Sequence, residues 1–462
     1  MILSETNKPD TVNTTKRRWM YPLVRKGKLY RYRSWLSYFY LILFFAAPYC
    51  RINGNPVVLL NVLERRFVIL GQVFWPQDFF LFVLAMLASL VCIVLFTMAF
   101  GRVFCGWICP QTIFMEMVFR KIEIWIEGDP KQRRRLDEGD WTNEKIWKKG
   151  LKHALFLILS FIIANTFLAY IIGSENLIRI ITEPIHAHLS GFISISIFTA
   201  IFYLVYSYVR EIVCTVICPY GRLQGVLTDK STLQVAYNYL RGEPRGKRSR
   251  KTETTKTTGD CVDCGLCVDV CPTRIDIRNG IQLECINCTA CIDACNDVML
   301  KINREVNLIG FYSEEMIEQK TRPEFTTRMA AYSGVMVVLL GVLSFFVLKR
   351  SDIDITVLRS AGLLYQEQPG GYISNIYSAD LINKTNIAQQ VKLEADDPAV
   401  KIKYIQPLGK LAKEESTRIT FFVMIPAKNI RKAKTEINLK VVQGDKELGT
   451  ATTTFIGPIN AE

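Results

Sequence analysis

Long apolar runs alternate with polar, charged segments over the first three quarters of the chain. Five of these runs reach, or nearly reach, the length that a bilayer-spanning helix needs, and they cover residues 34–50, 79–100, 153–172, 190–209 and 331–348. A polar, basic stretch precedes the first run, without the apolar core of a signal peptide. The pattern predicts a multi-pass membrane protein with five spans.

From residue 351 onward the hydrophobic period changes. Segments such as "YISNIYSADLIN", "TRITFFVMIP" and "TEINLKVVQ" read as strands, several with apolar side chains at every second position, and polar or Gly/Pro stretches separate them. About seven such segments predict an immunoglobulin-like sandwich. The absence of cysteine after residue 351 excludes the antibody-type disulfide but not this fold. A bare sandwich binds or braces a partner, so we assign it no chemistry.

Eight of the fourteen cysteines lie in one polar stretch, residues 261–295, as two runs of the form C-x₂-C-x₂-C-x₃-C. This spacing is typical of a two-cluster bacterial ferredoxin, in which the fourth cysteine of each run reaches the other cluster. Zinc sites and disulfide frameworks rarely show two such runs. Asn296 stands where a proline often follows the last cysteine, but that position shapes a turn and holds no ligand. The spacing assigns four ligands to each [4Fe–4S] cluster: Cys261, Cys264, Cys267 and Cys295 to the first, and Cys285, Cys288, Cys291 and Cys271 to the second.

The predicted fold class is a multidomain α+β membrane protein. It combines a five-span transmembrane helical bundle, a two-cluster bacterial ferredoxin module and a C-terminal immunoglobulin-like β-sandwich. The expected parts, in order, are a basic tail (1–33), a region with four spans (34–235), a flexible linker (236–257), the ferredoxin module (258–305), a connector (306–330), the fifth span (331–348) and the sandwich (351–462).

The net charge of +14 is distributed in a way that argues against nucleic acid as the partner. Residues 1–33 carry nine Lys and Arg and residues 101–152 carry eleven, whereas residues 51–78 carry three and 173–189 carry one. This alternation follows the positive-inside rule. It predicts a bacterial inner-membrane protein with a cytoplasmic N-terminus and ferredoxin module and an exported C-terminal domain. The basic run 131–135 suits anionic membrane lipid.

Two further cysteine pairs follow membrane spans. Cys105 and Cys109 lie in "GRVFCGWICP", and Cys214 and Cys218 lie in "REIVCTVICP". Residues four apart share a face of a helix, so each pair can present two thiols, and the proline should kink or end that helix. If the two spans pack together, four thiols meet, and soft thiolates suit Cu(I), zinc or iron–sulfur clusters. The alternative is that these are small buried residues without a redox role.

The remaining candidate ligands are few. Cys50 and Cys92 sit alone in apolar runs and are expected in the core. His186 and His188 form an H-x-H that could bind copper on the exported side, or could be ordinary loop residues. No C-x-x-C-H or Walker motif is present, which excludes c-type haem and leaves nucleotide binding unsupported. Whether flavin or haem binds between spans stays open.

Together these segments resemble the FixG/RdxA/CcoG family of cytochrome oxidase accessory proteins over nearly the whole chain. "GRVFCGWICPQT", "REIVCTVICPYGRLQG", "RGEPRG" and "CPTRIDIRNGIQLECINC" carry the resemblance. It implies a role in assembling the cbb-type haem-copper oxidase, by reduction of Cu(II) to Cu(I). It carries over the eight cysteines of 261–295 as cluster ligands and Cys105, Cys109, Cys214 and Cys218 as membrane-side cysteines of less defined role.

The expected function is therefore that of a cupric-reductase-like oxidoreductase with two [4Fe–4S] clusters and a copper ion at the membrane-side cysteines, which we treat as the catalytic group. Expected partners are a cytoplasmic electron donor, oxidase assembly factors and copper chaperones, and membrane lipid, with a homodimer as one allowed assembly. Two alternatives remain: an electron-transfer subunit of a respiratory or quinol-linked complex, and a non-enzymatic assembly scaffold.

Overall fold

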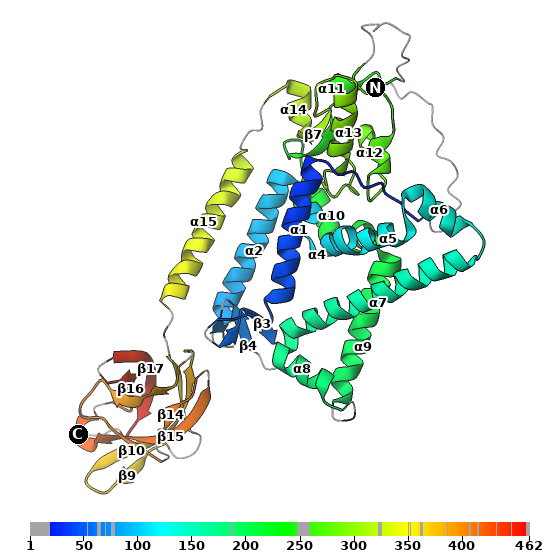
Figure 1. Cartoon of the computed structure of the whole chain (residues 1–462). Helices are drawn as coiled ribbons and strands as arrows, with labels where there is room; N and C mark the ends of the chain where they lie inside the picture. Colours follow the sequence, from blue (N-terminus) through cyan, green and yellow to red (C-terminus); the bar gives the residue numbers. More distant parts are fainter. Residues whose placement is uncertain are drawn as a thin grey trace. The chain divides into compact units, whose positions relative to one another are not determined.

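The computed structural model describes most of the chain (Figure 1). The described ranges are 19–52, 54–61, 66–69, 71–74, 79–184, 186, 188–246, 259–321, 326–349, 351, 353–360, 364–385, 387–405, 408–413, 415–430, 432–444 and 446–458. Residues 1–18 of the predicted tail and 247–257 of the predicted linker lie outside them. The chain divides into two compact units, the first made from Met1–Phe45, Ala88–Leu168 and Arg179–Val337, the second from Ala46–Leu87, Ala169–Ile178 and Val338–Glu462.

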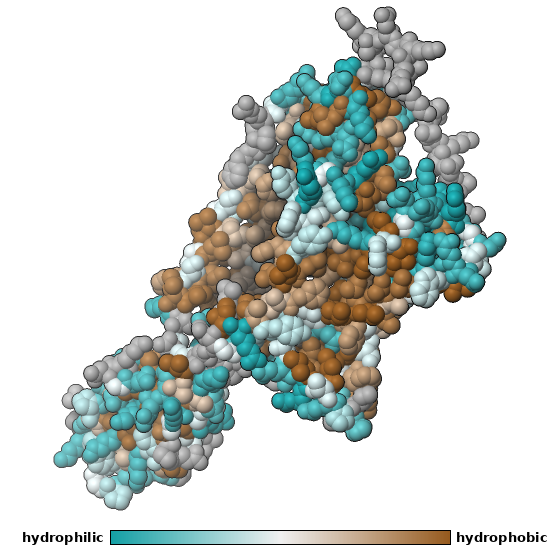
Figure 2. Space-filling model, viewed as in Figure 1, coloured by the Kyte–Doolittle hydropathy of each residue, from teal (hydrophilic) through white to brown (hydrophobic). Residues whose placement is uncertain are grey.

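Four of the described helices are long and apolar enough to cross a membrane. They are α2 (Phe79–Phe100), α7 (Asn143–Ile172), α9 (Leu189–Leu204), which continues as the π-helical turn η4 (Val205–Val209), and α15 (Thr327–Leu348). The most apolar stretch of α15 is not buried within the protein at all. In α2, 11% of the corresponding stretch is buried. Figure 2 shows this exposed hydrophobic surface along the long helices. Such surface is stable where lipid covers it.

The predicted count of five spans is one too many by this measure. The first run forms α1 (Lys28–Ala46), whose N-terminal half carries Lys28, Arg31 and Arg33 and is too polar for a lipid-facing helix. Arg33 is buried instead. Asp293 of the ferredoxin module accepts hydrogen bonds from the Leu29 and Tyr30 amides, at 3.2 and 2.7 Å. Polar contacts, rather than lipid, therefore hold the start of α1.

A series of short helices follows α2 and α9 in the first unit. After α2 come α3 (Val103–Trp107), α4 (Pro110–Ile113), the π-helix η2 (Phe114–Phe119), α5 (Arg120–Glu127) and α6 (Pro130–Glu138). After α9 come the π-helix η5 (Val213–Ile217) and α10 (Pro219–Leu227). Phe119 and Tyr206 stack in parallel between these segments, with ring centroids 4.4 Å apart.

The ferredoxin module is closed by a two-stranded antiparallel sheet that extends beyond residues 258–305. Strand β6 (Gln234–Tyr237) pairs with β7 (Ile309–Tyr312). Between them lie α11 (Tyr239–Gly242), α12 (Leu266–Asp269), the 3₁₀ turn η6 (Ile277–Asn279) and α13 (Ala290–Lys301), and α14 (Glu314–Gln319) follows β7. Val235, Ile292, Met299 and Leu308 form its buried core around the cysteines.

The second unit contains small sheets and the predicted sandwich. Residues 51–74 form the pair β1 (Arg51–Ile52) and β2 (Asn55–Pro56) and the meander β3 (Val58–Asn61), β4 (Arg66–Ile69) and β5 (Gln72–Phe74). Short helix α8 (Ser174–Thr182) begins in this unit. The sandwich sheets have the orders β13-β15-β10-β8, with β9 beside β10, and β12-β16-β17, and a short β11–β14 pair adds to them.

The sandwich strands alternate buried and exposed side chains, as the sequence predicts. Their bounds are β8 (Ile353–Arg359), β9 (Gln366–Gln368), β10 (Tyr372–Asn383), β11 (Gln389–Gln390), β12 (Lys392–Ala395), β13 (Lys401–Tyr404), β14 (Lys410–Leu411), β15 (Ser416–Pro426), β16 (Lys434–Gln443) and β17 (Lys446–Ile456). Fully buried Tyr377, Phe421, Leu439 and Phe455 fill the space between the sheets. The immunoglobulin-like fold is confirmed.

Replacing Asp293 with alanine removes the acceptor for two amides at the start of α1. We expect a loss of about 0.5–2 kcal/mol, the usual effect of deleting a helix N-cap, seen as a lower melting temperature of the purified protein. Asp297→Ala on the same helix is the matched control. Equal melting temperatures for the two variants would show that Asp293 does not hold α1.

Candidate iron–sulfur and thiol site

The eight ferredoxin cysteines line two neighbouring cavities. Each cavity is bounded by one of the two groups that the spacing assigns to a cluster: Cys261, Cys264, Cys267 and Cys295 around one, and Cys271, Cys285, Cys288 and Cys291 around the other. Their volumes are equal, about 20 Å³ each. The fourth cysteine of each run thus faces the other run's cavity, which is the crossed arrangement of two-cluster ferredoxins.

These cavities suit iron–sulfur clusters better than single metal ions. Among the described residues, no three cysteines, histidines or carboxylates converge closely enough to hold one ion. Burial raises the pKa of Cys285 and of Cys295 to about 12, so these thiols stay protonated at neutral pH until iron displaces the proton. Asn287 Nδ2 is buried without a partner beside Cys285 and Cys288. Such a donor can bond to a cluster sulfur.

Cys267 lies on the wall of both cavities. It belongs by spacing to the first cluster, yet its side chain also borders the space assigned to the second. Burial raises its pKa to about 11. The shared lining residue shows that the two cavities are neighbours, which favours electron exchange between the predicted clusters.

The two C-x₃-C-P motifs adopt the same backbone turn. The amide of Cys109 donates to the Phe104 carbonyl at 2.9 Å, and the amide of Cys218 donates to the Val213 carbonyl at 2.7 Å, five residues back in each case. Each second cysteine caps a new helix whose first residue is the proline, Pro110 or Pro219. The proline therefore begins a helix after a break, and the two cysteines of a pair do not share one helix face as predicted.

The turn brings Cys105 and Cys214 together against the second ferredoxin run. Cys105 forms a buried cluster with Ile286 and Cys288, and Cys214 packs against this cluster. Cys105 is buried, while Cys109, Cys214 and Cys218 are partly exposed. Burial raises the pKa of Cys105 to about 11, against the lowering effect of the Arg102 guanidinium, and that of Cys214 to about 12. The four thiols act electrostatically on one another but do not form a ready metal-ion geometry.

Arg102 connects both motifs to the ferredoxin module. Its buried guanidinium donates to the Leu283 carbonyl, to Gln224 Oε1 at 3.2 Å and to the Cys214 carbonyl at 3.5 Å. Gln224 in turn accepts a hydrogen bond from the Cys105 thiol at 3.2 Å. No local sequence pattern predicts the role of Gln224, because only the fold brings α10 beside Cys105.

Gly106 allows the first motif to touch the ferredoxin backbone. A Cβ at this position would overlap the Ile286 carbonyl oxygen and lie 2.9 Å from the Cys288 amide nitrogen and Cα. The corresponding position after Cys214 is Thr215. Glycine in the first motif, against threonine in the second, is thus the sequence feature that accompanies the close contact.

A buried ion network anchors the second motif. Arg210, which has φ +53°, donates twice to the Glu123 carboxylate, at 3.1 and 2.7 Å, and Glu123 also pairs with Arg133 at 3.2 Å. The next residue, Glu211, pairs with fully buried Arg120. Burial alone would raise the pKa of Glu123, but Arg210 and its other cationic neighbours hold it well below its ordinary value. Removing one member of a buried pair leaves an uncompensated charge, which is costly.

The other candidate ligands lie apart from this site. His188 Nε2 pairs with Glu183 at 2.5 Å, His186 is exposed, and the described residues offer no metal geometry there. Cys50 and Cys92 are exposed, so their predicted core packing is wrong. Cys92 lies on α2, where lipid is the expected neighbour.

Placing a side chain at Gly106 should separate the first motif from the ferredoxin module. We expect Gly106→Ala to destabilise the protein by about 1–3 kcal/mol, as overpacking does, and to slow oxidation of the reduced clusters by added Cu(II), the acceptor expected at the thiols, while the iron content stays unchanged. Stopped-flow mixing of the reduced protein with Cu(II) measures that rate. Thr215→Ala, at the matching position of the other motif, is the control; equal rates in both variants would refute the role of this contact.

Comparison with known proteins agrees with the arrangement. Models described as a 4Fe-4S dicluster domain, a 4Fe-4S binding domain and an IG-like fold at the C-terminal of FixG, putative oxidoreductase, match residues 209–314, 82–130 and 343–458. Similar proteins include Protein RdxA of Cereibacter sphaeroides, 34% identical over 82% of each chain, and Nitrogen fixation protein FixG of Rhizobium meliloti, 32% identical over 80% of this chain and 77% of that one. Ferredoxin-type protein NapH of Escherichia coli is 25% identical over 40% of this chain and 65% of its own. The chain belongs to the family of membrane iron–sulfur electron-transfer proteins that includes RdxA and FixG.

Proposed function

We propose that this protein reduces Cu(II) to Cu(I) during assembly of a cbb-type cytochrome c oxidase. The observation that carries the proposal is the packing of Cys105 in one buried cluster with Cys288, a predicted ligand of the second iron–sulfur cluster, with Cys214 packed against that group. When bound, the two [4Fe–4S] clusters would supply one-electron carriers, and Cu(II) accepts one electron. The contact gives the thiol site a direct connection to such a carrier.

The donor set of the thiol site favours copper in its reduced form. Thiolates are soft ligands and stabilise Cu(I) over Cu(II). Burial keeps Cys105 and Cys214 protonated without metal, so copper binding must release protons. Three of the four cysteines are partly exposed, and the site has no preformed ion geometry. These properties suit an ion that is held briefly and passed on.

Membrane orientation is part of the proposal. The basic segments 1–33 and 101–152 favour a cytoplasmic N-terminus and ferredoxin module, with the C-terminal sandwich exported. The start of α1 contacts Asp293, and Leu233, just before the module's first strand, donates to the Ala99 carbonyl near the end of α2. Helices α1 and α2 therefore both have one end at the module. The exported sandwich would dock assembly factors or copper chaperones, and the donor would be cytoplasmic.

Replacing all four thiols of the site tests the copper step. We expect Cys105→Ser, Cys109→Ser, Cys214→Ser and Cys218→Ser combined to abolish Cu(II) reduction, because the soft ligands are lost, while about eight iron atoms per chain remain. Anaerobic purification, iron and sulfide analysis and a Cu(I)-chelator assay measure this. Cys92→Ser is the control and should keep full activity. Undiminished reduction in the quadruple variant would remove copper chemistry from this site.

An electron-transfer subunit of a respiratory or quinol-linked complex is the second candidate. The partial similarity to a ferredoxin-type protein, NapH, favours it. Such a subunit would purify with a stoichiometric partner and reduce no copper. A third role, as a scaffold, would require variants without electron transfer to support normal oxidase assembly.

A further inference from the structure

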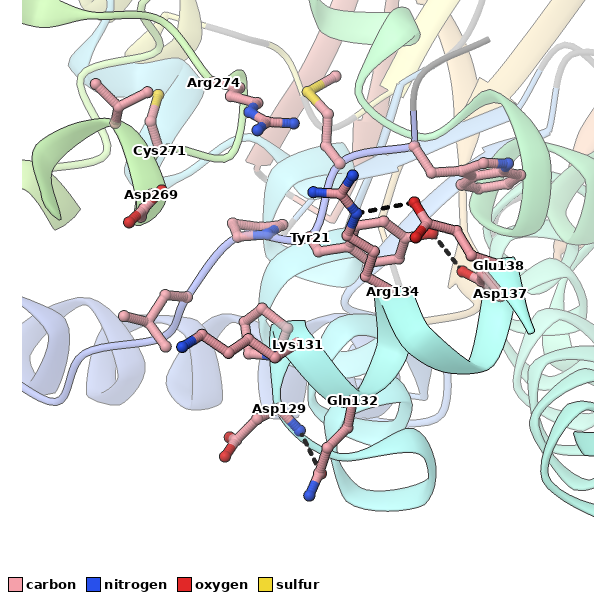
Figure 3. Close-up of a pocket in the computed structure, with 16 residues that line it drawn as sticks. Tyr21, Asp129, Lys131, Gln132, Arg134, Asp137, Glu138, Asp269, Cys271 and Arg274 are labelled. Carbon is pink, nitrogen blue, oxygen red and sulfur yellow. Dashed lines mark hydrogen bonds and ion pairs between the residues drawn. The ribbon is translucent and has the colours of Figure 1, made fainter. Parts of the chain in front are cut away.

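A third cavity, larger than the two cluster cavities, borders the ferredoxin module away from the thiol site. Its volume is about 1070 Å³, the size of a small-molecule site. Three segments enclose it: residues 19–23, helix α6 and the turn 268–274 (Figure 3). Cys271, a predicted ligand of the second cluster, forms part of the wall. A molecule in this cavity would touch a cluster ligand.

The N-terminal segment contributes fixed aromatic rings. The guanidinium of Arg210 lies 5.6 Å from the ring centre of Trp19, and that of Arg133 lies 5.8 Å from that of Tyr21. Arg133 also donates to the Pro22 carbonyl at 3.1 Å, and the Leu23 amide donates to the Asp269 carbonyl at 2.8 Å. The buried ion network thus holds the segment against both α6 and the module. Fixed Trp and Tyr rings suit a planar aromatic ligand.

Cationic side chains reach the same space. In Figure 3 Arg134 and Arg274 extend toward it from opposite walls, and Lys131 lies below them. The nearby carboxylates are largely occupied: Asp137 accepts from Tyr21, and Glu138 pairs with Arg134 at 2.8 Å. Among the described residues, the side chains of Lys131 and Arg274 have no ion-pair partner. Asp129, beside Lys131 on α6, and Asp269, beside Cys271, add two further carboxylates to the lining. Two available cations suit a phosphate group.

We propose that this cavity binds flavin mononucleotide, with its ring near Trp19 and Tyr21 and its phosphate between Lys131 and Arg274. Reduced flavin would then be the electron donor of the proposed function, on which this second step rests. Dihydroflavin releases two electrons and two protons and becomes oxidised flavin. One electron reduces each [4Fe–4S] cluster, and the protons pass to water. Cys267, on the wall of both cluster cavities, connects the two acceptors. The two clusters would thereby accept the two electrons of the donor one at a time.

Flavin binding can be measured without copper. Quenching of flavin mononucleotide fluorescence on titration with the purified full-length protein gives the affinity. We expect the double variant Lys131→Ala with Arg274→Ala to weaken binding about tenfold or more, and riboflavin, which lacks the phosphate, to bind correspondingly more weakly than flavin mononucleotide to the unaltered protein. Arg135→Ala, on the same helix but outside the cavity lining, should bind as the unaltered protein does.

The donor step has its own readout. Anaerobic mixing with photoreduced flavin mononucleotide should bleach the cluster absorbance, more slowly in the double variant. Absence of quenching, or equal affinities in the double variant and Arg135→Ala, would overturn the site. Copper reduction by protein that has been reduced with dithionite and then freed of the excess reductant separates the two proposals: if it persists without flavin binding, the cavity assignment fails and the proposed function stands. If flavin binds and bleaches the clusters but copper is not reduced, the cavity assignment stands and the proposed function fails.

Discussion

The close contact between the first C-x₃-C-P turn and the second ferredoxin run is the constraint on which the site depends. Gly106 lets two backbones meet where any side chain would hold them apart, and Arg102 ties the Leu283 carbonyl to both motifs. Without this contact the thiols and the predicted clusters would be separate features of one chain. Because electron transfer falls steeply with distance, the proposed pathway from the clusters to the thiols requires this contact.

The second motif is positioned by charge rather than by backbone contact. Arg210 and Glu211 directly follow the span. Arg210 pairs with Glu123, which also pairs with Arg133, and Glu211 pairs with Arg120. Buried charges are tolerated only when paired, so the network fixes the direction in which the chain leaves the membrane helix. Arg210 adopts a left-handed backbone conformation there, which a non-glycine residue keeps only when its surroundings impose it.

The same network reaches the N-terminal segment. Arg133 binds the Pro22 carbonyl and lies over Tyr21, and Asp293 holds the start of α1. One set of buried cations therefore connects the thiol motifs, the flavin-sized cavity and the ferredoxin module. The start of α1 is joined to the module through the backbone amides of Leu29 and Tyr30.

Spacing and periodicity by themselves determined the ferredoxin module, the grouping of its cysteines, the sandwich and four of the membrane helices. These features are local: cluster ligands recur at short intervals, and strands and spans are recorded in the period and length of apolar runs. Only the tertiary structure decided which ferredoxin run meets Cys105 and Cys214, that Gln224 bonds to a thiol, and that Arg33 is buried. Those facts depend on segments far apart in sequence, such as those of Cys105 and Gln224, and no local pattern records which of them meet. The C-x₃-C-P turns lie between the two cases: proline predicted a break in the helix, but the five-residue hydrogen bond that closes each turn, and the new helix that begins there, came from packing against the module.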